Sequence, residues 1–388
     1  MLIGILLFSA VLPIFAQTEN RSYYVRADGD DNNNGRSEDS PFRTLSKALD
    51  MATKGAVKKI TIIGTLTEKE FIMERFKDIA FGFRKLGSSE ILVTGKKDAS
   101  EEERAILTST MGKNAIIVDV SANVKFEYLE IRGVDKHDSG LQIRSGKVTI
   151  GNGVKICNCD SGIYLNKEIS NEACVLTLAG GEISNNLGTG IGVSNGATFN
   201  MESGVIRNNE TGGVIVYDST FILSGGEISN NGKPSTIEGE GGISFHKYYY
   251  NDRGDFSMTG GLVTGNTGKL GGGISFYADS PNYSLSISVS GGEITHNTSK
   301  MGGGIYIANS RTKLTIENAK ISNNKAEYGA GVYNTGAFLF KSGQIMNNEA
   351  EYVGGGVYLK EGSTFTNTSG ILKNNTAGDG EGQDIFKQ

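Results

Sequence analysis

The sequence predicts an all-β protein folded as a parallel β-helix, in which the chain winds into stacked coils of three short strands each. One phrase recurs eight times between residues 176 and 375, and residues 220–231 (TFILSGGEISNN) show it in full. Successive copies start 22 to 35 residues apart. Glycine supplies 55 of the 388 residues and proline only 4. A short phrase within a variable longer period is typical of a solenoid with one coil per repeat, and glycine without proline suits many tight turns.

Each repeat contains three apolar segments that we expect to be strands. They are illustrated by residues 225–231 (GGEISNN), residues 302–307 (GGGIYI) and residues 220–223 (TFIL). The connections between them are too short for a helical crossover. In every copy the first apolar residue precedes the later one by seven positions: Leu176/Ile183, Phe199/Ile206, Phe221/Ile228, Phe256/Val263, Ile287/Ile294, Leu314/Ile321, Phe338/Ile345 and Phe365/Leu372.

Strand alternation predicts that like residues stack on like from one coil to the next. Phe199, Phe221 and Phe256 should form one inward column, and a neighbouring column should run from Leu178 to Asn367. An asparagine follows the later apolar residue in each copy. We expect it to adopt the left-handed conformation of a sharp corner and to bond the next asparagine. This column is Asn186, Asn209, Asn231, Asn266, Asn297, Asn324, Asn348 and Asn375.

The N-terminal part of the chain divides into three. Residues 1–16 are almost wholly apolar, which predicts a signal peptide, with an apolar N-terminal anchor as the alternative. Residues 17–56 should hold a strand and a capping helix that begins at residues 39–42, after a cap residue and with Pro41 at the first position. We expect irregular coils in 57–123 and regular repeats in 124–388, so that 57–388 forms the β-helix.

Bulk composition excludes some classes of function. The net charge of −5 and a pI near 5.5 give no basic footprint, so nucleic acid is not an expected partner. No apolar run after residue 16 is long enough to cross a bilayer as a helix, so no transmembrane span is expected after signal removal. Cys157, Cys159 and Cys174 allow at most one internal disulfide and lack the spacing of a metal site.

Two stretches of sequence resemble known families. Residues 297–306, 324–333 and 348–358 resemble the paired repeats of polymorphic outer-membrane autotransporter passengers, and residues 23–32 with 40–48 are similar to the opening of bacterial pectate-lyase-like proteins. The resemblance implies a right-handed, single-stranded β-helix on an exported bacterial protein. The translocating barrel of autotransporters has no counterpart after Phe386, so self-secretion is not expected. Residence in the periplasm, on the outer surface or as a secreted protein stays open.

An enzyme of this superfamily should show clustered carboxylates on outward strand positions. Glu182 and Glu227 lie in one outward column but two coils apart, roughly 10 Å, with Val205 between them. This spacing indicates a solvated strand face, so no catalytic residue is assigned. An enzyme that uses an unrecognised groove remains an alternative.

Outward tyrosines are the first candidate contact surface. Tyr306, Tyr333 and Tyr358 occupy the same place in consecutive coils, where an exposed aromatic strip could receive sugar rings or a partner's apolar patch. The alternative is that stacked tyrosines simply stabilise the sheet.

Two adjacent insertions, residues 246–255 and 277–283, are the second candidate surface. Because successive coils stack, the two loops should project together as a polar, aromatic group of the kind that dominates recognition surfaces. Residues 253–255 also spell Arg-Gly-Asp, a tripeptide that arises easily by chance. The proposed contact residues are His246, Tyr248, Tyr249, Tyr250, Asp252, Arg253, Tyr277, Asp279 and Tyr283.

Metal binding has one weak candidate. Asp28, Asp30 and Asn32 supply oxygen ligands that could hold Ca²⁺, but the segment departs from the EF-hand pattern, and a solvated turn is the alternative. No other cofactor is indicated. Taken together, these features favour an envelope- or surface-associated, adhesin-like binding protein that presents its rod to glycans or to extracellular or envelope proteins. A polysaccharide lyase or glycoside hydrolase and a structural spacer are the alternatives.

Overall fold

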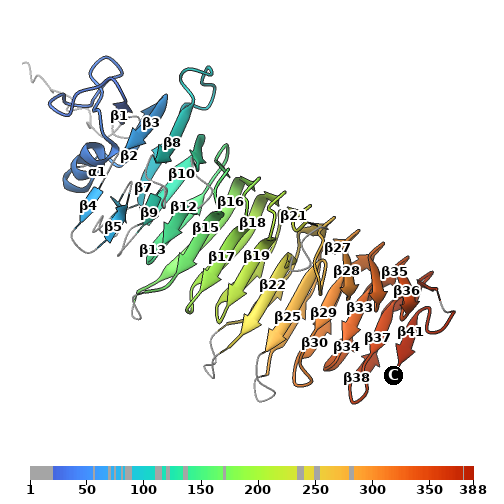
Figure 1. Cartoon of the computed structure of the whole chain (residues 1–388). Helices are drawn as coiled ribbons and strands as arrows, with labels where there is room; N and C mark the ends of the chain where they lie inside the picture. The colour runs from blue at the N-terminus through green and yellow to red at the C-terminus, as the bar shows by residue number, and fades with distance from the viewer. Residues whose placement is uncertain are drawn as a thin grey trace, which may run out of the picture.

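The computed structural model shows a rod of stacked coils that runs from the N-terminal end, covered by one helix, to the C-terminal end (Figure 1). The parallel β-helix with a short N-terminal helix is therefore confirmed. The expected signal peptide lies outside the described residues. The residues that the structure describes are 21–55, 57–68, 71–73, 76–79, 82–83, 90–109, 116–118, 123–133, 139–168, 172–233, 240–248, 254–278, 284–378 and 380–388.

Two stacks of parallel strands form one 23-stranded sheet, because β16 (Cys174–Ser184) and β18 (Thr198–Arg207) serve both stacks. The first stack also contains β1 (Tyr23–Arg26), β2 (Lys59–Ile63), β7 (Glu90–Thr94), β10 (Asn123–Glu127), β13 (Gly146–Ile150), β20 (Thr220–Leu223), β23 (Phe256–Met258), β26 (Ser286–Val289), β30 (Lys313–Ile316), β34 (Ala337–Phe340) and β38 (Thr364–Asn367). The second stack adds β3 (Thr65–Glu68), β8 (Ala105–Ser109), β11 (Leu129–Arg132), β14 (Lys155–Cys157), β21 (Glu227–Ser229), β24 (Leu262–Thr264), β27 (Glu293–Thr295), β31 (Ala319–Ser322), β35 (Gly343–Met346) and β39 (Ile371–Lys373).

A third stack is a separate 12-stranded parallel sheet, which completes the three strands per coil. It contains β6 (Gly82–Phe83), β9 (Ile116–Val118), β12 (Ser139–Ile143), β15 (Ser161–Asn166), β17 (Thr189–Ser194), β19 (Gly212–Tyr217), β22 (Gly241–Lys247), β25 (Ile274–Ala278), β29 (Ile305–Ile307), β33 (Val332–Asn334), β37 (Val357–Leu359) and β41 (Ile385–Lys387). The last coils carry a short fourth stack, which the sequence did not predict: β28 (Thr298–Met301), β32 (Lys325–Tyr328), β36 (Glu349–Val353) and β40 (Thr376–Ala377). An antiparallel pair, β4 (Phe71–Met73) and β5 (Phe76–Ile79), lies near the N-terminal end.

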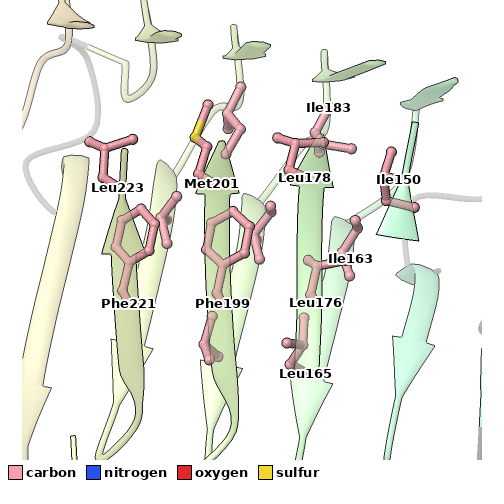
Figure 2. Close-up of a cluster of buried hydrophobic side chains, with 14 of the residues drawn as sticks. Ile150, Ile163, Leu165, Leu176, Leu178, Ile183, Phe199, Met201, Phe221 and Leu223 are labelled. Carbon is pink, nitrogen blue, oxygen red and sulfur yellow. The ribbon is translucent and has the colours of Figure 1, made fainter. Parts of the chain in front are cut away.

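The core consists of the predicted columns. Phe221 pairs with Phe199 on one side and with Phe256 on the other, with ring centroids 4.8 and 5.7 Å away. Figure 2 shows Phe199 and Phe221 continuing the row of Leu176, and Met201 and Leu223 continuing that of Leu178. All of these side chains are fully buried. Stacked coils thus bury a continuous apolar interior in which each coil needs its neighbours.

The asparagine column forms a hydrogen-bonded ladder, as predicted. The Nδ2 of Asn266 donates to Oδ1 of Asn297 at 3.0 Å and to the carbonyl of Ile228 at 2.9 Å. The expected left-handed corner residue was wrong, because it is the residue before the ladder asparagine. His296, for example, has φ 57°, whereas Asn297 is absent from the positive-φ residues. The ladder side chain points inward to bond its neighbours, so the residue that turns the chain is the one that precedes it.

The repeated glycines are explained by this ladder. A Cβ on Gly273 would lie 2.6 Å from the carbonyl oxygen of Gly304, 2.8 Å from Cγ2 of Ile294 and 3.0 Å from Nδ2 of Asn297. The equivalent Gly190, Gly213, Gly304 and Gly331 meet the same three kinds of atom, and Gly242 meets a glycine carbonyl and the Asn266 side chain. Only glycine lets the third stack pass this close to the asparagine column.

The helix α1 (Leu45–Lys54) covers the N-terminal end but begins later than predicted. Its N-cap is Thr44, whose side chain accepts from the amide of Lys47 at 3.2 Å. Asp31 fixes this start, because its carboxylate accepts from the amide and the hydroxyl of Thr44. Phe42 is buried but extended, since its backbone pairs with Tyr24 and Arg26 of β1. That strand-like pairing prevents a helix from starting at residues 39–42.

Candidate functional site

A ladder of seven aromatic rings follows the outward face of the third stack. Neighbouring ring centroids are separated by 4.6 to 5.9 Å. Alternation places every second residue of each strand on this face, so the rings of consecutive coils meet. We call it the ring ladder; its members are Tyr217, His246, Tyr277, Tyr306, Tyr333, Tyr358 and Phe386.

The ring ladder joins two columns of the sheet. Tyr217, His246 and Tyr277 are in register with one another, whereas Tyr306 is in register with Ser275. The rings of Tyr277 and Tyr306 nevertheless meet across this offset, with centroids 5.9 Å apart. The structure therefore places His246 and Tyr277 of the second candidate surface in line with the tyrosines of the first. It also adds Tyr217 and Phe386, which sequence reasoning missed.

The rings face each other rather than solvent. Tyr333 and Tyr358 stack with an interplanar angle of 7°, and each is only 7% exposed. This differs from the freely exposed strip that alternation suggested, because each ring covers the face of the next. Burial, with a smaller contribution from neighbouring phenols, raises the pKa of Tyr333 to about 12. Burial also raises the pKa of Tyr217 to about 12, so these phenols stay neutral and offer hydroxyls along the ladder edge.

A polar cluster interrupts the aromatic surface at β22. The hydroxyl of Ser244 donates to a carboxylate oxygen of Glu240 at 2.7 Å and lies 2.8 Å from Nε2 of His246. Ser275 of the next coil donates its hydroxyl to that of Ser244 at 3.0 Å. Burial raises the pKa of Glu240, but the His246 ring 3.7 Å away and the hydrogen bond from Ser244 outweigh burial and hold this pKa below its usual value.

The cluster resembles acid–base machinery in composition but lacks its geometry. Ser244 and Ser275 are fully buried, so neither hydroxyl can reach a substrate as a nucleophile. Glycoside hydrolysis commonly needs two carboxylates about 5 to 9.5 Å apart, and Glu240 is the one carboxylate of this cluster among the described residues. The arrangement holds the His246 ring in the ladder and fixes the partly exposed carboxylate of Glu240 beside it.

The loop residues of the second candidate surface are placed only in part. The Tyr248 ring contacts Tyr217 and His246 at centroid distances of 5.5 and 5.7 Å, and its hydroxyl lies 3.5 Å from Nδ1 of His246. Tyr248 therefore widens the ring ladder at its N-terminal end. The remaining loop residues fall outside the described residues: Tyr249, Tyr250, Asp252, Arg253, Asp279 and Tyr283.

The carboxylates on the second stack do not form a pair. Glu182 accepts from the hydroxyl of Ser184 and from Arg207. Burial raises its pKa, but these two hydrogen bonds outweigh burial and keep the pKa low. Val205 separates Glu182 from Glu227, as the column predicted.

The weak calcium candidates are engaged in an ion pair and in hydrogen bonds of their own turn. Asp28 pairs with Arg26, and Oδ1 of Asp30 accepts from the backbone amide and the side-chain amide of Asn32. These contacts describe a hydrogen-bonded turn. Across the described residues, no group of three or more His, Cys, Asp or Glu side chains is arranged to hold a metal ion.

Comparison with known protein families, with curated proteins and with solved structures finds no match to this chain. The two family resemblances of the sequence therefore rest on its motifs alone, while the parallel β-helix itself is shown. Among the described residues, no helix has the length and apolar character needed to span a membrane.

Proposed function

We propose that this protein is an exported, envelope- or surface-associated binding protein, and that its ring ladder receives an extended glycan. The single observation that carries the proposal is the continuity of the ladder over consecutive coils, with steps of 4.6 to 5.9 Å. The step from ring to ring is about the length of one sugar unit, so the ladder matches the repeat of an extended glycan chain.

The chemistry of the ladder edge supports a glycan. Because the ring faces are occupied by neighbouring rings, a ligand meets ring edges and phenol hydroxyls, which donate and accept hydrogen bonds. Glycan hydroxyls can satisfy these groups, and glycan C–H groups can pack between them. Glu240 is 30% exposed at its side chain and adds an acceptor at the N-terminal end of the ladder.

Removal of hydroxyls tests the proposal without disturbing the stack. Tyr277→Phe combined with Tyr306→Phe keeps both rings, so a ladder with a purely structural role should be unaffected. The wild-type protein (residues 17–388) and the double variant are compared on an array of immobilised glycans and matrix proteins. Two lost hydrogen bonds should weaken glycan binding by roughly tenfold or more. Tyr24→Phe, a half-buried tyrosine on the first stack, is the matched control.

Two outcomes would reject the glycan assignment. Either the wild-type protein is retained by no glycan, or the double variant binds as well as the Tyr24→Phe control. Retention by a matrix protein, lost in the double variant, would move the ligand class from glycan to protein.

Export has its own test. It is supported by the apolar character of residues 1–16, which ends just before Gln17. We expect the mature protein from the native cell to begin at Gln17 and to fractionate with the envelope or the medium. Mass spectrometry that finds residues 1–16 on the mature protein would contradict a cleaved signal peptide and favour the anchor.

A further inference from the structure

A cationic hollow lies at the corner between the first and second stacks, apart from the ring ladder on the third stack. Its volume is about 270 Å³, which suits a small group rather than a large ligand. The chain forms it where β7, β10 and β13 pass into β8, β11 and β14. Residues 95–104 make the longest of these connections. The lining residues are Lys96, Lys97, Ala99, Arg104, Tyr128, Leu129, Glu130, Gly153 and Lys155.

The charge of the hollow is positive although the whole chain carries −5. Four of its lining residues are Lys or Arg, and Glu130 is its one carboxylate. Lys96 donates to Glu38 and Glu103, both at 2.8 Å. Glu130 accepts from Arg132 at 2.6 Å. Lys96 and Arg132 thus engage Glu38, Glu103 and Glu130, and the other three lining cations stay outside these contacts.

Three of the cations are available to a ligand. Lys97, Arg104 and Lys155 are exposed, and none of them forms an ion pair with the residues that the structure describes. Asp98, Glu101 and Glu102 share the same connection as Lys97 and Arg104 but do not line the hollow. Cations gathered in one hollow raise the local concentration of an anionic ligand.

A left-handed corner of the coil lies at the same place. Tyr128 has φ 49°, which is rare for a bulky residue, and its counterpart in the next coil is Gly153, with φ 70°. The backbone amide of Tyr128 donates to the carbonyl of Asn152 at 2.9 Å, which holds the turn. A Cβ on Gly153 would lie 2.5 Å from Cδ1 of the Tyr128 ring. The glycine thus makes room for a ring that forms one wall of the hollow.

We propose that this hollow binds the dianionic phosphate group of a phosphate monoester, with Lys97, Arg104 and Lys155 as its charge partners. Three cations without an ion-pair partner among the described residues match a phosphate dianion better than a singly charged carboxylate. Ammonium and guanidinium donors form strong, charge-assisted hydrogen bonds to phosphate oxygens. The volume leaves space for part of the carrier, which can lie against the Tyr128 ring.

Calorimetry with defined probes tests the site at low ionic strength and about pH 7.5, where a phosphate monoester is dianionic. The probes are inorganic phosphate, glucose 6-phosphate, glucuronate and glucose. We expect both phosphates to bind and glucuronate to bind at least about tenfold more weakly. Lys97→Gln and Lys155→Gln should each weaken phosphate binding about tenfold or more. Lys313→Gln, an exposed lysine on β30, should leave it unchanged.

The Glu130→Gln variant tests the sign of the electrostatic effect. Removal of the one lining carboxylate should strengthen phosphate binding, and an unchanged circular dichroism spectrum would show that the fold is intact. The proposal is overturned if neither phosphate binds, if glucuronate binds as tightly as glucose 6-phosphate, or if Lys155→Gln behaves like Lys313→Gln. This test does not involve the ring ladder, so the phosphate site and the glycan-binding function can each fail without the other.

Discussion

Asn266→Ala is the perturbation whose effect on stability follows most directly from the structure. The Asn266 side chain is fully buried and takes part in four hydrogen bonds. Its Oδ1 accepts from the backbone amide and from the Nδ2 of Asn231, both at 2.9 Å. Alanine replaces neither acceptor nor donor. With about 1 kcal/mol for each bond, the expected loss is about 4 kcal/mol.

Amide hydrogen exchange is the suitable assay, because a solenoid opens locally and a single global free energy is not well defined. The opening free energy of amides in β21, β24 and β27 should fall by about 4 kcal/mol, and that of distant coils should fall less. Asn200→Ala is the matched control. Asn200 lies half-buried on β18 outside the ladder, so its replacement should cost within about 0.5 kcal/mol. An Asn266→Ala protein that exchanges like the Asn200→Ala protein would refute the ladder's role.

Three further outcomes are expected. Gly273→Ala should lower the local opening free energy measured by amide exchange by about 1–3 kcal/mol, because its Cβ would meet backbone, whereas Gly192→Ala meets only the movable Tyr164 ring. In the same assay Phe221→Ala should lower the opening free energy of its own and neighbouring coils by about 3–5 kcal/mol, and Ile222→Ala, at a 38% exposed residue, should lower it far less. Burial raises the pKa of Cys157 to about 11 and that of Cys174 to about 12, both above the ordinary 9.0. Both thiols should therefore resist alkylation at about pH 8 until the protein unfolds. The contribution of these two neutral thiols to stability is fully present below pH 9, the ordinary thiol value. It should be lost as the pH rises through the folded-state values. These expectations would be contradicted if Gly273→Ala and Gly192→Ala, or Phe221→Ala and Ile222→Ala, had similar effects on amide exchange. Rapid alkylation of Cys157 or Cys174 in the folded protein, or a stability that does not change with pH above 9, would contradict the thiol prediction.

The columns of the core could be predicted because identical phrases must stack in the same way. Phe199, Phe221 and Phe256 occupy one position of that phrase, and the spacing of the variable loops does not alter it. The conformation of single residues could not be predicted so well. The positive φ of His296 rather than Asn297, and the start of α1 at Leu45, depend on hydrogen bonds between residues of different coils or turns.

The candidate site was predictable only where consecutive coils keep the same phrase. Tyr306, Tyr333 and Tyr358 align because each follows the glycine-rich segment of its coil at the same position, although the coils are 27 and 25 residues long. The contact between Tyr277 and Tyr306 depends on a two-residue offset that no repeat pattern announces. Glu240 and Ser244 stand at even spacing with His246, which is the one sequence signal that could have revealed the polar cluster. The cationic hollow depends on residues 96–104, which lie in the coils expected to be irregular, where the sequence offers no alignment with the regular repeats.

Disulfide trapping across neighbouring coils tests the central claim that outward residues of successive coils form one continuous surface. Ser244 and Ser275 are in register on β22 and β25, with hydroxyl oxygens 3.0 Å apart. The Ser244→Cys/Ser275→Cys protein should form this disulfide on mild oxidation, detected by mass spectrometry as the loss of two hydrogens. A protein that instead forms the bond only as Ser244→Cys/Tyr277→Cys would show a two-residue slip and contradict the account.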